Sequence, residues 1–389
     1  MQTSPLPDRP LSFTILGPVV PLRGGIAQYT TLLAETLAKR GPVRVFSFSR
    51  LFPSFLYPGR SQRQDKAMLA TPANVEFCLD SVNPITWKRT ANKIIASKPD
   101  LLIVPLWTTF LVPTLYSVVS VVKRHTATKV LFICHNVMPH DVSNAHLQVM
   151  KALLKRGDFA LVHSDYEREM LGKEVPRLKV VKHFHPIYEF FARPAQVHDV
   201  SDEDARSNLR IPKDKLLMLF FGFVRPYKGL GVLLRAMPEI LKSVDASLLI
   251  VGEFWKRREP YDRAIADLGI VDSVRIIDRY VPDNEVALYF RASDVVVLPY
   301  REATQSGVVQ IAYGFRKPVI TSDVGGLPEV VEDGKTGYVV SREDPAKLAA
   351  AVLRFAEDRG RVDFTSNIEA IADRFSWDRL CEVIMGVCE

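Results

Sequence analysis

One stretch decides the fold: DVVVLPYREATQSGVVQIAYGFRKPVITSD, which covers residues 294–323. It opens with an apolar run at 294–300 and closes with a second at 318–323, a pattern typical of buried parallel strands. A short polar loop leads from the first run into a helical segment, so the stretch predicts a strand, a crossover helix and a second parallel strand. In open sheets of this kind ligands bind beyond the carboxyl ends of the strands, where this loop would lie.

The same alternation extends outward over the whole chain. Strands are expected in the second half at 215–222, 247–253, 273–278 and 336–340, and in the first half at 12–18, 42–48, 100–106, 129–134 and 159–163. Helical patterns lie between them, and residues 50–72 are expected to form a long loop. We therefore predict an α/β fold with two doubly wound, Rossmann-like domains facing a central cleft, the default binding site. The predicted domains are residues 1–190 and 191–370, followed by a carboxyl-terminal helix at 371–389.

Composition agrees with two domains, because the chain has 389 residues, of which 47% are hydrophobic and 24% charged. Residues 101–122 carry no charge and are long enough to cross a bilayer. Pro105 and Pro113 interrupt them, which favours a buried strand followed by a core helix. The amino terminus, MQTSPLPDRP, lacks the apolar centre of a signal peptide. Four cysteines without metal-binding spacing indicate free thiols in a reducing compartment, so we predict a cytoplasmic protein.

The net charge of +7 is unevenly distributed. Residues 1–190 hold 24 Lys and Arg against 13 Asp and Glu, a net +11, whereas the remainder holds 27 against 31, a net −4. A basic first half favours an anionic partner, namely a membrane surface, a phospholipid-linked acceptor or an acidic sugar. The alternative is a soluble surface with a local basic excess. Nucleic acid is not expected, because no basic run is interleaved with aromatic residues.

Two features of the first half are candidates for binding or chemistry. Gly24 and Gly25 follow the first strand and precede a helix, so backbone N–H groups could approach an anion there. The alternative is a plain turn, and no G-x-G-x-x-G fingerprint supports a nicotinamide cofactor. His135 ends the strand at 129–134 and is expected to face the cleft, where it could bind a sugar or transfer a proton. The alternative is a loop histidine, and a metal pair with His140 lacks a third ligand.

Two cations mark the second half, in FFGFVRPYKGLGVLLRA at residues 220–236. A strand ends at Gly222, and Arg225 and Lys228 follow just before a helix. An Arg fork and a Lys point charge at a helix start suit a diphosphate. The alternative is two solvated cations on a loop.

The loop of the opening stretch completes this site. Glu302 and Gln305 can bind sugar hydroxyls, while Ser306, Gly307 and the helix after them offer backbone N–H groups to a phosphate. A phosphorylated sugar suits this mixture of groups better than an apolar ligand does.

Longer motifs extend these features. In the second half they are GFVRPYKGLGVLLRA, VPDNEVALYFRASDVVVLPYREATQSGV, KPVITSDVGGLPEVVEDGKTGYVV and FSWDRL. In the first half they are LRGGIAQYTTLLAETLAKRG, CHNVMPHD and HSDYEREML. In combination they resemble the family 4 retaining glycosyltransferases, which have the GT-B architecture, over about residues 12–385. The resemblance implies that a nucleotide-sugar donor binds the second domain and an acceptor the first, with no metal and no other cofactor. It also implies that Trp377–Glu389 crosses back onto the first domain.

The resemblance also implies roles for individual residues. Arg225 and Lys228 would contact the diphosphate, His135 would lie near the donor sugar, and the Gly24–Gly25 turn would line the cleft near phosphate or acceptor. The predicted catalytic residues are His135, Arg225, Lys228 and Glu302. The predicted donor-binding residues are Gly222, Gly252, Glu253, Val281, Gln305, Ser306, Gly307 and Gln310.

Two departures from the family pattern concern this set. The family often has Arg directly after the glycine that ends the strand, whereas here Phe223 follows Gly222 and Arg225 comes two residues later. The family usually has two glutamates separated by seven residues, whereas here Gln310 stands in the second place after Glu302. An alignment on Lys317-Pro318 would instead put Ala303 and Ile311 at those two places.

The sequence therefore predicts a metal-independent retaining glycosyltransferase. It would move a hexose-type sugar from a nucleotide-diphosphate sugar to an acceptor in polysaccharide, glycolipid or other glycoconjugate synthesis, in the cytoplasm or at the inner face of the membrane. One alternative is a GT-B nucleotide-sugar epimerase. The other is a catalytically silent sugar-nucleotide-binding protein, which the neutral Gln310 suggests.

Overall fold

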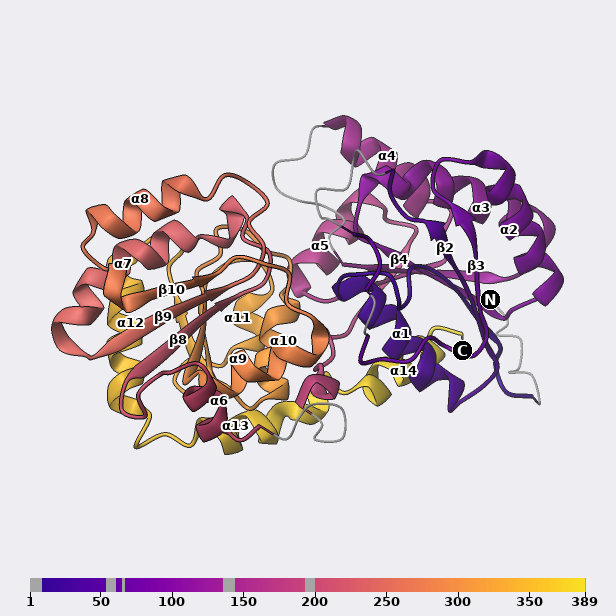
Figure 1. Cartoon of the computed structure of the whole chain (residues 1–389). Coiled ribbons are helices and arrows are strands. Elements are labelled where there is room, and N and C mark those ends of the chain that lie inside the picture. Colours follow the sequence, from indigo (N-terminus) through magenta and orange to yellow (C-terminus); the bar gives the residue numbers. More distant parts are fainter. Residues whose placement is uncertain (1–8, 54–60, 65–66, 136–143, 193–199, 389) are drawn as a thin grey trace. The chain divides into compact units, whose positions relative to one another are not determined.

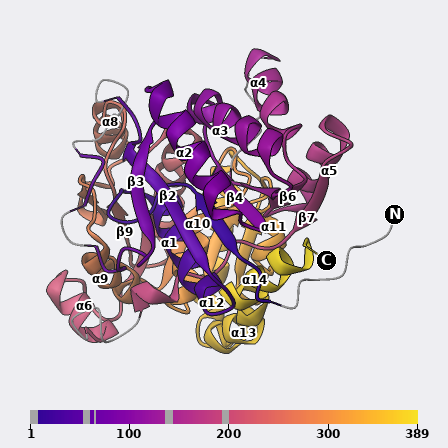
Figure 2. The same cartoon turned by 90° about the vertical axis from the view of Figure 1, so that its right-hand side faces the viewer.

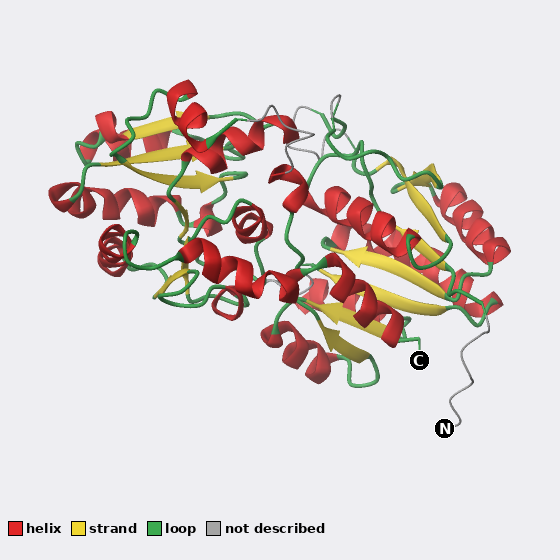
Figure 3. Cartoon of the chain, turned by 90° about the horizontal axis from the view of Figure 1, so that it is seen from below, coloured by secondary structure: helices red, strands yellow, loops and turns green. Residues whose placement is uncertain are grey.

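The chain forms two compact units in a computed structural model, which describes residues 9–53, 61–64, 67–135, 144–192 and 200–388. One unit comprises Met1–Phe184 with Phe375–Glu389, and the other comprises His185–Arg374. The chain thus divides after Phe184, where the sequence predicted a boundary after residue 190. In each unit parallel strands lie between helices, as Figure 3 shows for the strands in yellow and the helices in red.

The first unit is built on a seven-stranded parallel sheet of order β3-β2-β1-β4-β5-β6-β7 (Figure 1). The strands are β1 (Phe13–Leu16), β2 (Val43–Arg50), β3 (Val75–Asp80), β4 (Leu101–Leu106), β5 (Lys129–Cys134), β6 (Phe159–Val162) and β7 (Lys179–Lys182). The five strands expected from apolar runs are confirmed. The two edge strands, β3 and β7, were not predicted, because each carries polar residues on a partly exposed face.

Helices cover both faces of this sheet. They are α1 (Gly25–Ala38), α2 (Pro84–Ser97), α3 (Val112–His125), α4 (Asn144–Leu154), α5 (Asp165–Glu174) and α14 (Trp377–Gly386). Alternate residues of β4 point to opposite faces, so Leu102 and Val104 pack with α2 and α3, and Leu101 and Ile103 pack with α1 and α14. The helix α14 lies beside α1 (Figures 1 and 2), and this contact joins the last segment of the chain to the first unit.

The uncharged run at 101–122 forms β4, the short 3-10 helix η2 (Thr109–Leu111) and most of α3, as predicted. Within the described residues, none of the helices combines the length and the apolar character needed to cross a membrane. All four cysteines are free thiols, as expected.

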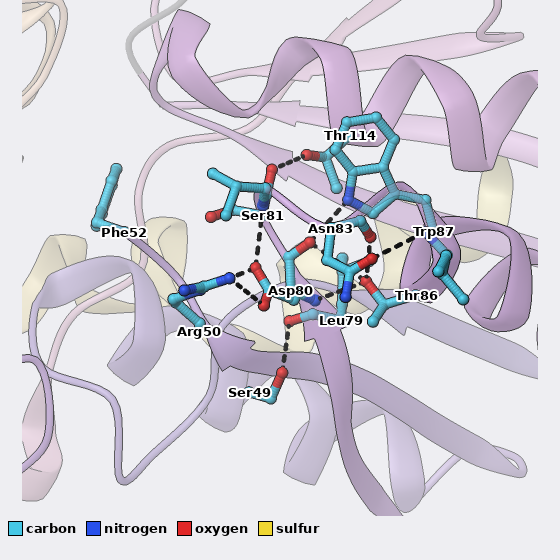
Figure 4. A network of polar contacts seen from close by, with 12 residues as sticks. Ser49, Arg50, Phe52, Leu79, Asp80, Ser81, Asn83, Thr86, Trp87 and Thr114 are labelled. Carbon is cyan, nitrogen blue, oxygen red and sulfur yellow. Dashed lines mark hydrogen bonds and ion pairs between the residues drawn. The ribbon is translucent and has the colours of Figure 1, made fainter. Parts of the chain in front are cut away.

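A polar network fixes the carboxyl ends of β2 and β3 (Figure 4). The Arg50 guanidinium donates two hydrogen bonds to the Asp80 carboxylate, at 3.0 and 2.6 Å. The Trp87 Nε1–H donates to the Asp80 carbonyl at 2.7 Å, and the Thr114 hydroxyl donates to the Ser81 carbonyl at 2.8 Å. These bonds tie two strand ends to the first turns of α2 and α3.

The second unit is built on a six-stranded parallel sheet of order β10-β9-β8-β11-β12-β13. The strands are β8 (Leu216–Phe221), β9 (Ala246–Val251), β10 (Val274–Ile277), β11 (Val295–Leu298), β12 (Val319–Ser322) and β13 (Gly337–Val340), and all six were predicted. The helices are α6 (Asp202–Asn208), α7 (Leu230–Ser243), α8 (Glu259–Asp267), α9 (Val286–Ala292), α10 (Gly307–Gly314), α11 (Leu327–Val330), α12 (Pro345–Asp358) and α13 (Phe364–Ile371).

The strand order of the second unit places two loops side by side. β8 lies between β9 and β11, so the chain leaves β8 in one direction across the sheet and returns to it from the other. A crevice forms at such a switch point, outside the carboxyl ends of the two central strands. The loops that follow β8 and β11 both begin there, and they carry the residues predicted to bind a donor.

Candidate functional site

The loops after β8 and β11 meet through backbone contacts. The Arg301 N–H donates to the Tyr227 carbonyl at 2.7 Å. A Cβ built on Gly222 would lie 3.7 Å from a methyl carbon of Val308, in the first turn of α10. The two sequence motifs that predicted a phosphorylated ligand therefore form one structural site.

Lys228 is the cation at the centre of this site. Its side chain is only 7% exposed, in the 3-10 helix η5 (Pro226–Lys228). Gly222 has φ +95°, and a Cβ there would lie 2.9 Å from the Lys228 Nζ. A residue with a side chain at position 222 would therefore crowd the ammonium group, and glycine does not. The Nζ also lies 5.4 Å from the ring centroid of Tyr300. Burial lowers the pKa of Lys228, and the nearby Arg225 charge lowers it further.

Arg225 is the second cation, and it lies immediately before η5. Its guanidinium carbon is 3.4 Å from the ring centroid of Trp255. Its Nε is buried and has no hydrogen-bond partner among the described residues, and burial lowers the pKa of the guanidinium. Within the described part of the chain, no carboxylate pairs with Arg225 or Lys228. Two desolvated cations without an anion cost free energy, which a bound oxyanion would recover.

The start of α10 supplies neutral donors beside these cations. The Ser306 Oγ caps the helix by accepting a hydrogen bond from the Val308 N–H at 3.3 Å, and it lies 3.4 Å from the Tyr300 hydroxyl. Burial raises the pKa of Tyr300 to about 12, so this hydroxyl stays protonated at neutral pH. Gly307 begins the helix, whose first N–H groups and dipole favour an anion.

Three polar side chains near this helix start have unused hydrogen-bonding capacity. The Oε1 atoms of Gln305 and Gln310 are buried and accept no hydrogen bond from any described residue. Gln310 is only 1% exposed, and its backbone carbonyl accepts from the Tyr188 N–H at 3.3 Å. Glu302 is half-buried on the loop after β11. Groups of this kind can bind the hydroxyls of a polar ligand.

Three further predicted residues follow β9 and β10. Gly252 has φ +149°, and a Cβ there would lie 2.0 Å from the Gly222 carbonyl oxygen, so the two strand ends approach as closely as glycine allows. The Glu253 carbonyl accepts a hydrogen bond from the Val224 N–H at 2.9 Å. Val281 is buried and offers only apolar contact.

The glycine turn of the first unit is open. Gly24 is the N-cap of α1 with φ +109°, and its carbonyl accepts from the Ala27 N–H at 3.0 Å. A Cβ on Gly24 or Gly25 would meet no atom of the described residues within 4 Å. Within that part of the chain, no side chain fills the space beside these two Cα atoms.

His135 lies at the carboxyl end of β5, and its N–H donates to the Leu106 carbonyl at 2.8 Å. The sequence predicted that its ring would face away from the core, but the ring is only 3% exposed. The ring centroid of Tyr29 is 4.4 Å away in an edge-to-face arrangement, and that of His163 is 5.2 Å away. The position of His135 at a strand end was predicted correctly. The aromatic rings around it were not, because Tyr29 lies on α1 and His163 directly follows β6. His140 lies outside the described residues.

Sequence reasoning missed Trp255 and Tyr300. Tyr300 was treated as the end of a strand, although its ring lies beside Lys228. Phe254 and Trp255 follow Gly252 and Glu253, so a signal existed: two aromatic residues after a strand that neighbours β8. No metal site was predicted, and among the described residues no three His, Cys, Asp or Glu side chains are grouped to hold a metal ion.

Comparison with known proteins shows what parts of this chain are similar to. Residues 215–358 match the family model described as Glycosyl transferases group 1. The D-inositol 3-phosphate glycosyltransferase of Acidothermus cellulolyticus is 32% identical over 192 residues, which are 47% of this chain and 43% of that protein. Residues 215–358 are thus similar to the group 1 glycosyltransferases. The matched part of the chain spans less than half the length of that curated relative.

Solved structures share the fold of this chain over nearly its whole length. Sucrose-phosphate synthase from Thermosynechococcus elongatus aligns with a TM-score of 0.72 and 20% identity, covering 97% of this chain and 98% of that one. HepE of Anabaena, in complex with UDP and glucose, aligns with a TM-score of 0.73 and 17% identity, covering 97% and 100%. The predicted GT-B fold is thereby confirmed.

Proposed function

We propose that this protein is a glycosyltransferase that moves a hexose-type sugar from a nucleotide-diphosphate sugar to an acceptor, with retention at the anomeric carbon and without a metal ion. The observation that supports it is the pair of desolvated cations, Arg225 and Lys228, without a carboxylate partner among the described residues. A diphosphate supplies the missing negative charge and fits both an Arg fork and a Lys point charge.

The chemistry follows from where charge develops. As the bond between the anomeric carbon and the phosphate oxygen breaks, negative charge grows on the diphosphate, and Arg225 and Lys228 stabilise it. Removing one such stabilising group costs on the order of 100-fold in rate. The acceptor oxygen bonds to the anomeric carbon on the face that the phosphate leaves, and the leaving phosphate oxygen takes the acceptor's proton. This route needs no strong base from the protein.

Other residues of the second unit position the donor. Ser306 and Gly307 present the start of α10 to a phosphate, while Glu302 and the buried amide oxygens of Gln305 and Gln310 bind hydroxyls of the sugar or ribose. We assign the acceptor to the first unit, with the open Gly24–Gly25 turn near it. His135 would act near the donor sugar.

The comparisons suggest classes of substrate. The HepE structure contains UDP and glucose, and the Acidothermus relative is named for D-inositol 3-phosphate. A nucleoside-diphosphate hexose as donor and an anionic acceptor agree with the net charge of +11 over residues 1–190. We propose a lipid-linked acceptor or one at the anionic inner face of the membrane, which predicts binding to anionic liposomes that weakens as salt rises.

The test is nucleotide release from UDP- and GDP-sugars, measured for the wild type, Lys228→Ala and Lys242→Ala. Lys242 is the matched control, because it is an exposed lysine of α7 in the same unit. We expect Lys228→Ala to lose about 100-fold in turnover and Lys242→Ala to keep wild-type turnover. Equal turnover of all three proteins would refute the role of Lys228.

The products distinguish the two rival functions. An epimerised free sugar nucleotide without glycosylated product would favour an epimerase, and tight donor binding without transfer would favour a silent binding protein. Turnover that persists in excess EDTA is expected, and turnover that EDTA abolishes would contradict metal independence.

A further inference from the structure

The segments that follow β8 and β9 remain paired beyond the sheet. The Gly222 N–H donates to the Val251 carbonyl at 2.9 Å, and the Trp255 N–H donates to the Val224 carbonyl at 3.3 Å. Val224 and Phe254 form a parallel bridge between these hydrogen bonds. The pairing therefore sets Arg225 and Trp255, one residue further along each segment, beside one another.

The Trp255 indole lies between two side chains of the opposite segment. Its ring centroid is 4.9 Å from that of Phe223, with the planes inclined by 53°. The Arg225 guanidinium carbon is 3.4 Å from the Trp255 ring centroid, a distance at which a planar cation lies against an aromatic face. The indole therefore packs against both Phe223 and Arg225.

This contact matters because little else orients Arg225. Among the described residues, its Nε has no hydrogen-bond partner and no carboxylate pairs with it. A guanidinium without such partners can turn about its long side chain. An indole against one face holds the plane of the group and leaves its N–H edges available, and an edge is what binds an oxyanion with two parallel hydrogen bonds.

We propose that Trp255 is a positioning residue for Arg225, and that its indole face holds the guanidinium plane so that the N–H edges meet the oxygens of a bound diphosphate. The identity of that anion rests on the proposed function. Trp255 acts through Arg225 and need not touch the ligand itself.

The experiment compares Trp255→Leu, Trp255→Phe, Arg225→Ala and the Trp255→Leu/Arg225→Ala double variant with the wild type. Calorimetry measures the affinity of each protein for UDP, for uridine and for inorganic pyrophosphate. We expect Trp255→Leu to weaken UDP and pyrophosphate binding about tenfold, the scale of a desolvated cation–aromatic contact. Uridine affinity should be unchanged, and Trp255→Phe should retain most of the wild-type affinity. In the Arg225→Ala background, Trp255→Leu should have no further effect.

Phe254→Leu is the matched control, because the neighbouring Phe254 ring packs on Tyr261 of α8, 5.6 Å between centroids. We expect Phe254→Leu to leave the affinities for all three ligands unchanged. Thermal melting of the unliganded variants detects a folding defect directly. Such a defect would also lower the affinity for uridine, whereas a positioning effect would not.

Four results would overturn the proposal. One is equal loss of uridine and UDP affinity in Trp255→Leu, which would mean that the indole contacts the nucleoside or supports the whole site. Another is a loss in Trp255→Phe as large as in Trp255→Leu, because the buried indole N–H, which donates to no described residue, would then bind the ligand. The others are unchanged pyrophosphate binding in Trp255→Leu and full additivity with Arg225→Ala. A wild type that binds pyrophosphate but none of UDP, GDP, ADP and TDP would refute the proposed function. The role of Trp255 would then still be decided by the pyrophosphate affinities of the variants.

Discussion

Gly222 and Lys228 fit together so closely that a Cβ on residue 222 would lie 2.9 Å from the Lys228 Nζ. The glycine also has φ +95°, which side chains rarely adopt, at a cost of about 1–3 kcal/mol. We therefore expect Gly222→Ala to displace the ammonium group and to weaken nucleoside diphosphate binding about 10- to 100-fold. Calorimetry with the nucleoside diphosphate that binds the wild type most tightly measures this loss.

Gly360→Ala is the control for that substitution. Gly360 belongs to the same unit, has no positive φ, and would meet no atom within 4 Å if it carried a Cβ. We expect it to leave affinity unchanged. Wild-type affinity in Gly222→Ala would mean that Lys228 does not need its present position.

The lowered pKa of Lys228 predicts a pH dependence of ligand binding. Burial and the Arg225 charge hold the pKa below its ordinary value of 10.5 in the free protein, and a bound diphosphate would raise it again. A group whose pKa rises on binding contributes affinity that is fully present below the free pKa and is lost as pH rises through that pKa toward the bound one. We expect diphosphate affinity to fall on the alkaline side, starting below pH 10.5.

Lys228→Arg provides the comparison, because an arginine stays charged over this range. Its affinity, whatever its absolute value, should not show the alkaline decline of the wild type. Identical alkaline profiles for the two proteins would assign the decline to another group.

Replacement of Gln310 by leucine should have opposite effects on stability and on ligand binding. Its Oε1 is buried without a donor among the described residues, and an unsatisfied buried polar group costs about 1–3 kcal/mol. Gln310→Leu should therefore unfold at an equal or higher temperature than the wild type without ligand. The rise in melting temperature caused by a nucleotide sugar should be smaller, because the amide no longer binds a hydroxyl.

Thermal unfolding with and without UDP-glucose measures both effects. The control is Gln310→Glu, which keeps an acceptor in place but adds a charge to a site that is 1% exposed. It should melt lower than the wild type without ligand. A Gln310→Leu protein that melts lower alone but shifts normally with ligand would show that the amide is structural.

The sequence predicted the inner strands of both sheets because β4, β5, β8 and β11 are apolar on both faces. It did not predict β3 and β7, whose positions at the sheet edges follow from strand order and not from local pattern. Arg225 and Lys228 were found because they lie three residues apart in one loop.

Trp255 could not be assigned in the same way, because its contact with Arg225 depends on a backbone pairing that joins segments thirty residues apart. The same holds for His135: the strand end was visible in the sequence, but Tyr29 and His163 approach it only in the folded unit. Arg225 lies two residues later than the family pattern suggests, which keeps its side chain on the same face but moves its Cα by roughly 6–7 Å.

The Arg50–Asp80 pair gives a prediction for the stability of the first unit. Burial opposes ionisation of Asp80, but hydrogen bonds from Arg50 and from the Val82 N–H outweigh it and lower the pKa below 3.8. A carboxyl with a lowered pKa contributes stability above its unfolded pKa, and this contribution is lost as pH falls through the folded pKa.

Asp80→Asn keeps an acceptor for Val82 but loses the ion pair, so it should cost about 1 kcal/mol at pH 7, since Arg50 is half exposed. Urea unfolding measured by tryptophan fluorescence should show this difference at pH 7, and the difference should shrink as pH falls below 3.8. Asp378→Asn, which breaks the more exposed Arg40–Asp378 pair, should cost less than Asp80→Asn at pH 7. A deficit in Asp80→Asn that persists unchanged at low pH would mean that the carboxylate charge does not stabilise this strand end.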